Sequence, residues 1–559
     1  MDNQHNAVHP VTFLENIALS FSGGGYRASS FSLGVLSYFN NVKIKNSYKE
    51  KTTPLLENVK GISTVSGGTL TGAKYAVCIA RKDNFDTFYK TFYTFLNQNK
   101  LLDNALKKME DNAIWKATYK KHSLINAFSI AYKEELTDAK FDELINGNGH
   151  LEDICFNATD FSFGLAFRFQ LGGKFGNFKL ENDALEGAKG EFLVADMIAS
   201  SSCFPIGFAP MIMPDDYLSP KSKHFKAIKQ IATFHNGVGI LDGGIVDNQG
   251  IGSTMLADSR RNDPYDLIMV CDVGSYMMAP WEQSAIRPGE NSSLKSIIKR
   301  FTRWLNRKGI AIILTLVGIG LTVVGIGDFL AKFSKVFIYF GGILTLTGIL
   351  LFLWKLVLQV IFWVIRSKVK KIIPPFFFNK LQFFDDLKVN LFRRMIEERL
   401  TSGAKMVNDV FLKQIRRLNY DLFYSSPKLE NRRASALIYK LTKAQFKDKE
   451  SDENKGEDPI EDIPSPGDKI FNSAKIAAET ETTLWFTKTD REVERLKNLV
   501  ACGQFTACYT LLKYVCNFNT SKSDTDSNDI EDVKKNLLDH WIKFIDNPYW
   551  LWEKSGGNQ

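Results

Sequence analysis

Histidine and cysteine are both scarce in this chain of 559 residues, which carries seven of each. The cysteines show neither the paired spacing of a metal site nor the pattern of a secreted disulfide scaffold. We therefore expect reduced cysteines in the core, no metal and no other cofactor. The chain also lacks any motif for nucleic-acid binding and any internal repeat, which removes those classes of protein from consideration.

A secretory signal is also missing from the N-terminal stretch. Residues 1–10 are polar, and residues 11–21 have no basic region before them and no cleavage site after them. The net charge is +9, and 24% of residues are charged. This composition is typical of a soluble body that carries one hydrophobic insertion. Basic residues beside the apolar runs suit an anionic membrane surface.

Three consecutive glycines, Gly23, Gly24 and Gly25, follow the apolar run at 17–21. Glycines after a strand let backbone N–H groups converge on an anion, because no Cβ blocks the approach. The pattern Gly-x-Gly-x-x-Ala over residues 23–28 also fits a dinucleotide fingerprint, which expects an acidic residue about twenty positions further on. The first acid after the glycines is Glu50, so a nucleotide site stays open but poorly supported.

A second glycine turn places Ser66 between an apolar run and a helical pattern. Gly67 and Gly68 follow the serine, which is typical of a nucleophile elbow at the start of a helix. Ser63 is a rival nucleophile, since it has a glycine two positions before it. We favour Ser66, because the glycines after it open the backbone where an oxyanion must lie.

A third segment, residues 238–251, is an apolar strand that ends in Asp242, Gly243 and Gly244. Taken together and in this order, the glycine triplet with Arg27, the serine elbow and the Asp-Gly-Gly turn resemble the patatin-like phospholipases. Three further stretches resemble parts of that family, at residues 154–160, 199–205 and 482–486.

The resemblance implies a three-layer α/β/α sandwich with a central, mostly parallel sheet. It implies a Ser-Asp dyad of Ser66 and Asp242, with an oxyanion hole at Gly23, Gly24, Gly25 and Arg27. The resemblance also implies that Thr64, Gly67 and Gly68 form the nucleophile elbow. It implies that Gly243 and Gly244 form the turn that follows the proton acceptor. Thr64 departs from the family, which has glycine there, and we expect it to crowd the packing of helix on strand. Asp247 and Asp272 are interpreted as structural acids.

A histidine base is the competing mechanism, as in the Ser-Asp-His order of other hydrolases. After Asp242 the chain has only His540, in a remote polar tail, and His235 precedes it in a loop-like context. The sequence therefore favours the dyad over a triad.

Two apolar runs predict a transmembrane helical hairpin over residues 305–366. Residues 309–327 contain no charged side chain and would extend roughly 28 Å as a helix, close to the hydrocarbon thickness of a bilayer. A second run covers 336–354 and continues to 365 after Lys355. Basic residues flank both runs, which places the flanks, both termini and the catalytic part in the cytoplasm. The alternative is a buried helical pair in a soluble domain.

We expect four parts: a catalytic domain at 10–298, the hairpin at 305–366, a helical part at 372–517 with a flexible acidic loop at 448–468, and a linker with an aromatic tail at 518–559. The sequence predicts a membrane-associated serine lipid acyl hydrolase that acts on phospholipids or lysophospholipids through an acyl-enzyme. The alternative is a catalytically decayed or nucleotide-responsive membrane protein with the same fold. Oligomeric state is left open.

Overall fold

The computed structural model describes residues 12–45, 52–147, 149–180, 183–205, 207–274, 280–282, 296, 299–300, 303, 308–326, 334–372, 388–446, 463–518 and 527–556. Most of the predicted acidic loop and residues 519–526 of the predicted linker lie outside these ranges. The chain divides into two compact units, Met1–Met278 with Val407–Gln559, and Ala279–Met406. We call them the sheet unit and the hairpin unit.

The sheet unit is built on one mixed sheet, which has eight strands among the described residues. The strands are β1 Ile17–Phe21, β4 Val59–Val65, β5 Asp153–Asp160, β6 Leu165–Gln170, β7 Met211–Met213, β8 Val238–Asp242, β9 Leu267–Asp272 and β10 Arg433–Leu437. Their order is β10-β9-β1-β4-β5-β8-β7, with β6 paired to β5. A separate hairpin joins β2 Lys43–Lys45 to β3 Thr52–Pro54.

The core of the sheet is parallel, because β10, β9, β1, β4 and β5 all run in the same direction. Strands β6 and β8 pair antiparallel with β5, and β7 pairs antiparallel with β8. The predicted α/β class with a mostly parallel sheet is confirmed. The carboxyl ends of parallel strands lie at one edge, where ligand sites of open α/β sheets are found. Both Ser66 and the glycine triplet follow such strand ends.

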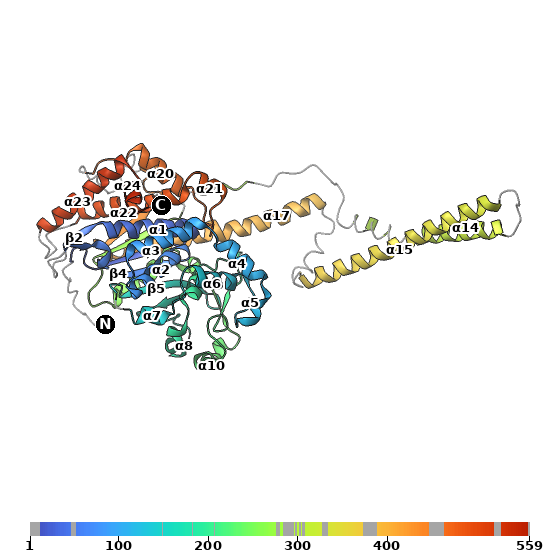
Figure 1. The fold of residues 1–559 in the computed structure, drawn as a ribbon, viewed down its shortest axis with the longest axis horizontal. Coiled ribbons are helices and arrows are strands. Elements are labelled where there is room, and N and C mark those ends of the chain that lie inside the picture. Colours follow the sequence, from blue (N-terminus) through green and yellow to red (C-terminus); the bar gives the residue numbers. More distant parts are fainter. Residues whose placement is uncertain are drawn as a thin grey trace. The chain divides into compact units, whose positions relative to one another are not determined.

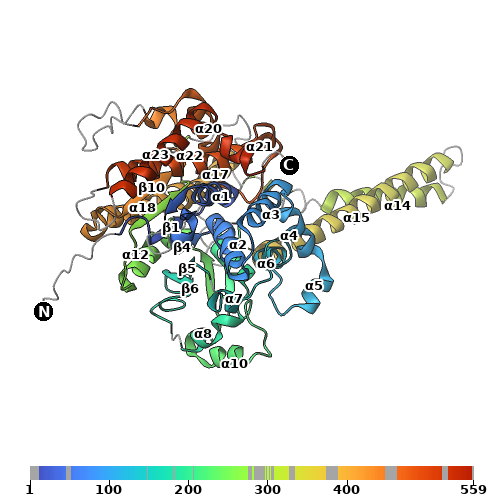
Figure 2. The ribbon, with the colours of Figure 1, turned by 60° about the vertical axis from the view of Figure 1, so that its left-hand side comes forward.

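Helices pack on both faces of this sheet (Figures 1 and 2). Successive side chains of a strand point to opposite faces, so each strand contributes apolar side chains to both layers of helices. Ala18, Ile268 and Val270 pack with Ile251 and Phe423 on one face, whereas Leu19 and Met269 belong to the larger core on the other. The helices of the sheet unit are α1 Gly25–Asn41, α2 Gly67–Arg81, α3 Phe85–Gln98, α4 Leu101–Glu110, α5 Asn112–Ala117, α6 Leu124–Glu135, α7 Phe141–Ile145, α8 Asp183–Ala188, α9 Val194–Ser201, α10 Lys223–Gln230, α11 Gly244–Asp247, α12 Ile251–Arg260, α18 Leu412–Ser425, α20 Asp468–Ala478, α21 Lys488–Glu492, α22 Arg495–Cys516, α23 Ser527–Asp546 and α24 Trp550–Lys554.

The C-terminal part of the chain completes this unit. Helix α22 lies along α1, where Gly34 and Gly503 let the two backbones approach closely: a Cβ on Gly34 would lie 2.1 Å from the carbonyl oxygen of Val500. The aromatic tail packs on the same body, since Trp541 is fully buried and donates to the Pro464 carbonyl at 2.8 Å. The aromatic tail therefore docks on the sheet unit.

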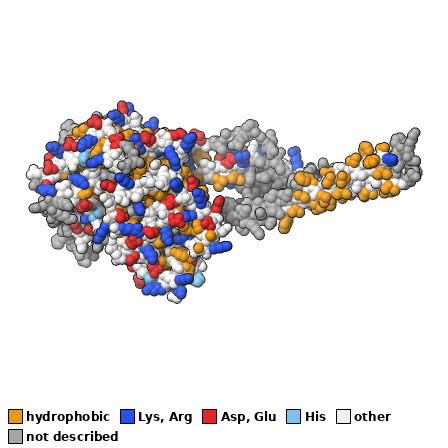
Figure 3. Space-filling model, viewed as in Figure 1, with side chains coloured by type: hydrophobic (Ala, Val, Ile, Leu, Met, Phe, Trp, Pro, Cys, Tyr) orange, Lys and Arg blue, Asp and Glu red, His pale blue; other side chains and the backbone are white. Residues whose placement is uncertain are grey.

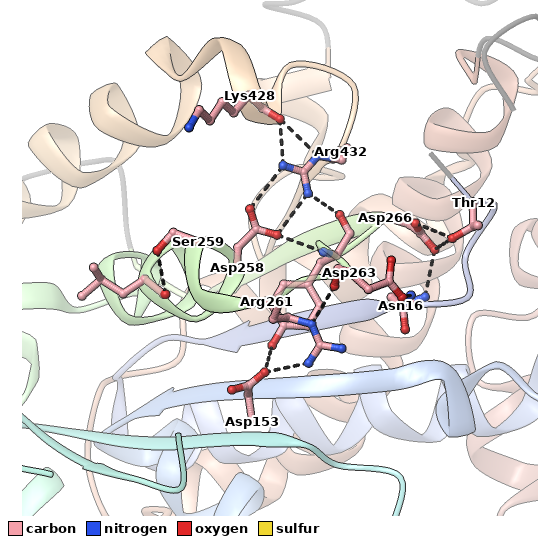
Figure 4. Close-up of polar contacts among 12 residues, drawn as sticks. Thr12, Asn16, Asp153, Asp258, Ser259, Arg261, Asp263, Asp266, Lys428 and Arg432 are labelled. Carbon is pink, nitrogen blue, oxygen red and sulfur yellow. Dashed lines mark hydrogen bonds and ion pairs between the residues drawn. The ribbon is translucent and has the colours of Figure 1, made fainter. Parts of the chain in front are cut away.

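Polar residues form hydrogen bonds and ion pairs at the amino edge of the parallel strands (Figure 4). The glycine turns follow the opposite ends of these strands. Asp266, just before β9, accepts from the hydroxyl of Thr12 at 2.7 Å and from the backbone N–H of Asn16 at 2.9 Å. Asp153, at the start of β5, pairs with Arg261 at 2.8 Å. These contacts hold the first residues of β5 and β9, whereas the glycine turns follow the last residues of β1 and β4.

The hairpin unit contains α14 Lys308–Ile326, α15 Ser334–Ile372 and α17 Val389–Lys405. Helices α14 and α15 pack through Gly318 and Gly341: a Cβ on Gly318 would lie 2.7 Å from the Gly341 carbonyl oxygen, and one on Gly341 would lie 2.6 Å from the Gly318 carbonyl oxygen. Figure 3 shows hydrophobic side chains over the surface of these two helices. Large side chains such as Leu316 and Phe340 are more than 60% exposed.

Two helices are long and apolar enough to cross a membrane within the described part of the chain. One is the segment Lys335–Trp354 of α15, of which 11% is buried, and the other is α22, which is 78% buried. Helix α22 is therefore explained as a core helix of the sheet unit. The first predicted span forms α14, whose apolar segment Ile312–Val324 is shorter. The two apolar runs thus form helices α14 and α15, and their insertion into a membrane stays a prediction.

Candidate active site

The glycine triplet leaves β1 and starts helix α1. Gly24 and Gly25 have φ angles of 145° and 57°, which side chains other than glycine rarely adopt. Gly23 donates its N–H to the Asn248 carbonyl at 2.9 Å. No acceptor for the N–H of Gly24 or Gly25 is found among the described residues. The loop thus presents two backbone donors at a helix N-terminus, where the helix dipole favours negative charge.

Ser66 lies in the sharp turn between β4 and α2, with φ 49° and ψ −120°. Such a positive φ in a non-glycine residue is strained and typical of a nucleophile elbow. Its N–H donates to the Ser201 hydroxyl at 2.9 Å. A Cβ on Gly67 would lie 2.0 Å from the Gly25 carbonyl oxygen, so the elbow and the glycine loop touch backbone to backbone.

Asp242 ends β8 and is 2% exposed. Its carboxylate accepts from the Gly244 N–H at 2.7 Å, and the Ser66 side chain lies close enough to act to lower its pKa. Burial outweighs the influence of Gly244 and Ser66 and raises the pKa of Asp242 to about 7. A carboxyl group that titrates near neutrality and contacts a serine has the properties of a general base. A Cβ on Gly243 would lie 2.4 Å from the Asn157 carbonyl oxygen, so a glycine is needed for the turn to pass this close to β5.

Thr64 is accommodated by a glycine on the facing helix. A Cβ on Gly72 would lie 2.4 Å from Cγ2 of Thr64. The absence of a side chain at Gly72 on α2 therefore leaves room for the Thr64 side chain on β4. The Thr64 hydroxyl donates to Thr69 at 3.0 Å, and Thr69 is 2.8 Å from the Ser201 hydroxyl. Ser201 in turn donates to the Asn157 carbonyl at 2.6 Å. Thr64 thus takes part in a hydroxyl chain behind the elbow.

We expect Gly72→Ala to destabilise the protein by about 1–3 kcal/mol, because the new methyl group overlaps Thr64. The double variant Thr64→Ser with Gly72→Ala removes the overlapping methyl group of Thr64, keeps the hydroxyl that bonds to Thr69, and should recover most of that loss. Thermal unfolding of the single and double variants measures this coupling. Equal melting temperatures of the single and double variants would contradict the account.

The rival nucleophile Ser63 is 3% exposed, and its hydroxyl donates to the Gly250 carbonyl at 2.8 Å while it accepts from Asn157 at 2.9 Å. This burial leaves no approach for a substrate. None of the described histidines lines the cleft that holds Ser66 and Asp242. His540 and His150 bond to tyrosines elsewhere.

Arg27 is 7% exposed, and its guanidinium donates through Nη1 to the Thr480 carbonyl at 2.7 Å. Burial lowers the pKa of Arg27 to about 10, with Asp272 acting in the opposite direction. The residue therefore ties the glycine loop to a segment more than 450 positions away in the chain. Sequence reasoning missed this partner, because no local pattern marks it.

Two further acids have structural partners, as interpreted from the sequence. Asp247 accepts from the N–H groups of Ile251 and Gly252 at 3.2 and 2.7 Å and so caps α12. Asp272 pairs with Arg416 at 2.6 Å. Burial acts to raise the pKa of Asp272, but the ion pair with Arg416 holds it below its ordinary value.

A cleft of about 1740 Å³ brings these residues together. Gly23, Gly24, Gly25, Arg27, Ser66 and Asp242 all line it. Part of the lining is apolar and comes from α4, α6 and the segment after α9: Leu102, Leu124, Phe128, Phe204 and Phe208. Another part is polar and comes from α18, α20 and the segments after β10 and α20. The cleft is larger than the roughly 300–1,000 Å³ of ordinary small-molecule pockets.

A strained serine turn and a buried aspartate thus lie in one cleft at the edge of an α/β sheet. Residues 19–255 match the model of the patatin-like phospholipase family, and the match supports membership of that family. In general terms the family indicates a lipid acyl hydrolase. No curated protein sequence matches the chain.

Proposed function

We propose that this protein is a membrane-associated serine lipid acyl hydrolase that cleaves fatty acyl esters of phospholipids or lysophospholipids. One observation carries the proposal: Ser66 in its strained elbow and the buried Asp242, whose pKa the Ser66 side chain acts to lower, line the same cleft as Gly24 and Gly25. Nucleophile, base and oxyanion donors then meet at one edge of the sheet.

In the proposed first step, the Asp242 carboxylate takes the hydroxyl proton of Ser66 as Oγ attacks the ester carbonyl carbon. The carbonyl oxygen becomes an oxyanion held by the N–H groups of Gly24 and Gly25. Collapse expels the alcohol, which takes the proton from Asp242, and leaves the acyl group on Ser66. One oxyanion donor contributes about 3–4 kcal/mol to lowering the barrier.

In the second step, Asp242 accepts a proton from water as that water attacks the acyl-enzyme. The second oxyanion is held by the same two N–H groups, and its collapse releases the fatty acid and frees Ser66 to regain its proton. Asp242 suits both steps, because a base with a pKa near the working pH can accept and return a proton.

The apolar lining of the cleft supports a long acyl chain as the bound group. Leu124, Phe128 and Phe208 offer side chains without charge in the cleft that Ser66 also lines. Incubation of the purified protein with phosphatidylcholine vesicles should release fatty acid and lysolipid. Release of neither, together with no labelling of the serine by a fluorophosphonate probe, would favour the alternative of a decayed site.

Membrane association is supported by the exposed apolar surface of α14 and α15, which we propose to span the bilayer with both flanks cytoplasmic. We expect the chain to stay in the membrane fraction after an alkaline carbonate wash. Leu346→Lys with Leu350→Lys, at positions 59% and 56% exposed, should release it, because a lysine costs roughly 3 kcal/mol at the centre of a span.

The matched control for this experiment is Leu106→Lys, at a position 46% exposed on the sheet unit. It changes a similar side chain to the same charge and should leave the fractionation unchanged. Recovery of the wild-type chain in the soluble fraction without detergent would refute the hairpin.

A further inference from the structure

Residues 480–486, here called the strap, run along the glycine loop. Thr480, Thr482 and Thr483 also line the cleft. The strap follows α20 and lies far outside the segment 19–255 that matches the family model. Its role in the site is therefore not contained in that match.

Backbone contacts join the strap to the loop. The N–H of Tyr26 donates to the Thr483 carbonyl at 2.7 Å, and Arg27 donates to the Thr480 carbonyl at 2.7 Å. A Cβ on Gly25 would lie 2.1 Å from the Thr483 carbonyl oxygen, so only glycine fits beneath the strap. The methyl group of Thr482 would be 3.8 Å from a Cβ on Gly24.

A clamp at the far end holds the strap in place. Asn99 donates through Nδ2 to the Phe486 carbonyl at 2.7 Å, and its Oδ1 accepts from the Phe486 N–H at 2.7 Å. The ring of Phe486 packs on Tyr26 with centroids 5.4 Å apart. Asn99 is the C-cap of α3, with φ 55°, and does not line the cleft.

Glycine backbone is the most freely rotating part of a chain, so two consecutive glycines do not by themselves aim their N–H groups. A preorganised oxyanion hole needs those groups held in one direction before the reaction. The residue after Gly24 and Gly25 is Tyr26, and its N–H is bonded to the strap. The strap therefore limits how the peptide planes just before it can turn.

We propose that the strap is a positioning element that sets the direction of the oxyanion donors, with Arg27 and Asn99 as its positioning residues. This inference rests on the proposed function of the same loop. It gives Arg27 a different task from direct contact with the oxyanion: it anchors the strap. It also makes the C-terminal part of the chain necessary for catalysis.

The test is Asn99→Gly in the full-length protein. Glycine keeps the left-handed C-cap of α3, so the helix remains while both clamp bonds are lost. The matched control is Asn84→Ala, which removes the N-cap of the same helix, where Asn84 accepts from the Asp86 N–H at 2.8 Å. This control weakens α3 without touching the strap.

We expect kcat of Asn99→Gly to fall about tenfold or more per serine titrated by a fluorophosphonate, with KM unchanged, because a misdirected donor acts only in the transition state. Asn84→Ala should retain wild-type kcat. Amide hydrogen exchange over residues 23–27 should be faster in Asn99→Gly and unchanged in Asn84→Ala.

The exchange measurement does not depend on activity. Unchanged exchange in Asn99→Gly, or equal effects of the two variants on kcat, would overturn the proposal that the strap positions the oxyanion donors. The wild type could also be inactive while exchange over residues 23–27 is still faster in Asn99→Gly. That result would contradict the proposed hydrolase activity and would leave the structural role of the strap intact.

Discussion

Ser66→Ala is expected to lower kcat for lipid hydrolysis by about 10⁴-fold or more, with the fold intact. The hydroxyl is the proposed nucleophile, and an alanine in the elbow leaves no atom to form the acyl-enzyme. The positive φ of 49° is unfavourable for alanine as for serine, so the strain of the turn is unchanged. Release of fatty acid from phosphatidylcholine vesicles measures the loss.

Ser202→Ala is the matched control for that variant. Ser202 lines the same cleft and is 3% exposed, but it caps the end of α9 and its hydroxyl donates to the Ile198 carbonyl at 2.8 Å. We expect hydrolysis close to that of the wild type. Comparable losses in both variants would show that removing a hydroxyl from this cleft is not specific to Ser66, and the dyad would lose its support.

Asp242→Asn is expected to lower kcat by about 10⁴-fold, because an amide cannot accept the proton of Ser66. The amide oxygen can still accept from the Gly244 N–H, which bonds to Oδ1 of the aspartate at 2.7 Å. The turn should therefore keep its shape. Circular dichroism confirms the fold, and undiminished hydrolysis would contradict the assignment of Asp242 as base.

The pKa of Asp242 also sets the pH dependence. The base must be ionised, so kcat/KM of the wild type should rise tenfold per pH unit below pH about 7 and level off above it. Esters without a titrating group of their own keep the profile interpretable. A profile that is flat from pH 5 to 8 would contradict a buried carboxylate as base.

Stability gives a second readout of the same group. Burial raises the folded pKa of Asp242 above its unfolded value, so its protonation favours folding. This stabilisation is fully present below the unfolded pKa and is lost as pH rises through about 7. Asp242→Asn should therefore raise the melting temperature relative to wild type more at pH 8 than at pH 5.

Local patterns in the sequence were enough to predict the parts of the site that lie at strand ends. Glycine-rich turns after apolar strands predict both the loop at 23–25 and the elbow at Ser66, because parallel strands bring their carboxyl ends to one edge. The mostly parallel sheet was predicted from the resemblance of these turns, taken in order, to the patatin-like phospholipases. The dyad itself stays a proposal, although Ser66 and Asp242 lie together.

Contacts between distant segments were not predictable. Thr64 looked like a crowded position, because the compensating Gly72 lies on the next helix and carries no signal of its pairing with the strand. Residues 482–486 of the strap resemble a stretch of the family, but their contacts with the loop could not be predicted. The bonds to Tyr26 and Arg27 use carbonyl groups, which every residue has. Only the fold shows which carbonyl lies beside the loop.

The central claim is that Ser66 is an activated nucleophile. Its most direct test is to treat the full-length protein with a fluorophosphonate and locate the adduct by mass spectrometry. We predict one covalent phosphonyl group on Ser66, formed in wild type and in Ser202→Ala but not in Ser66→Ala. An adduct on another residue, or lipid hydrolysis by a chain that remains unlabelled, would contradict the account.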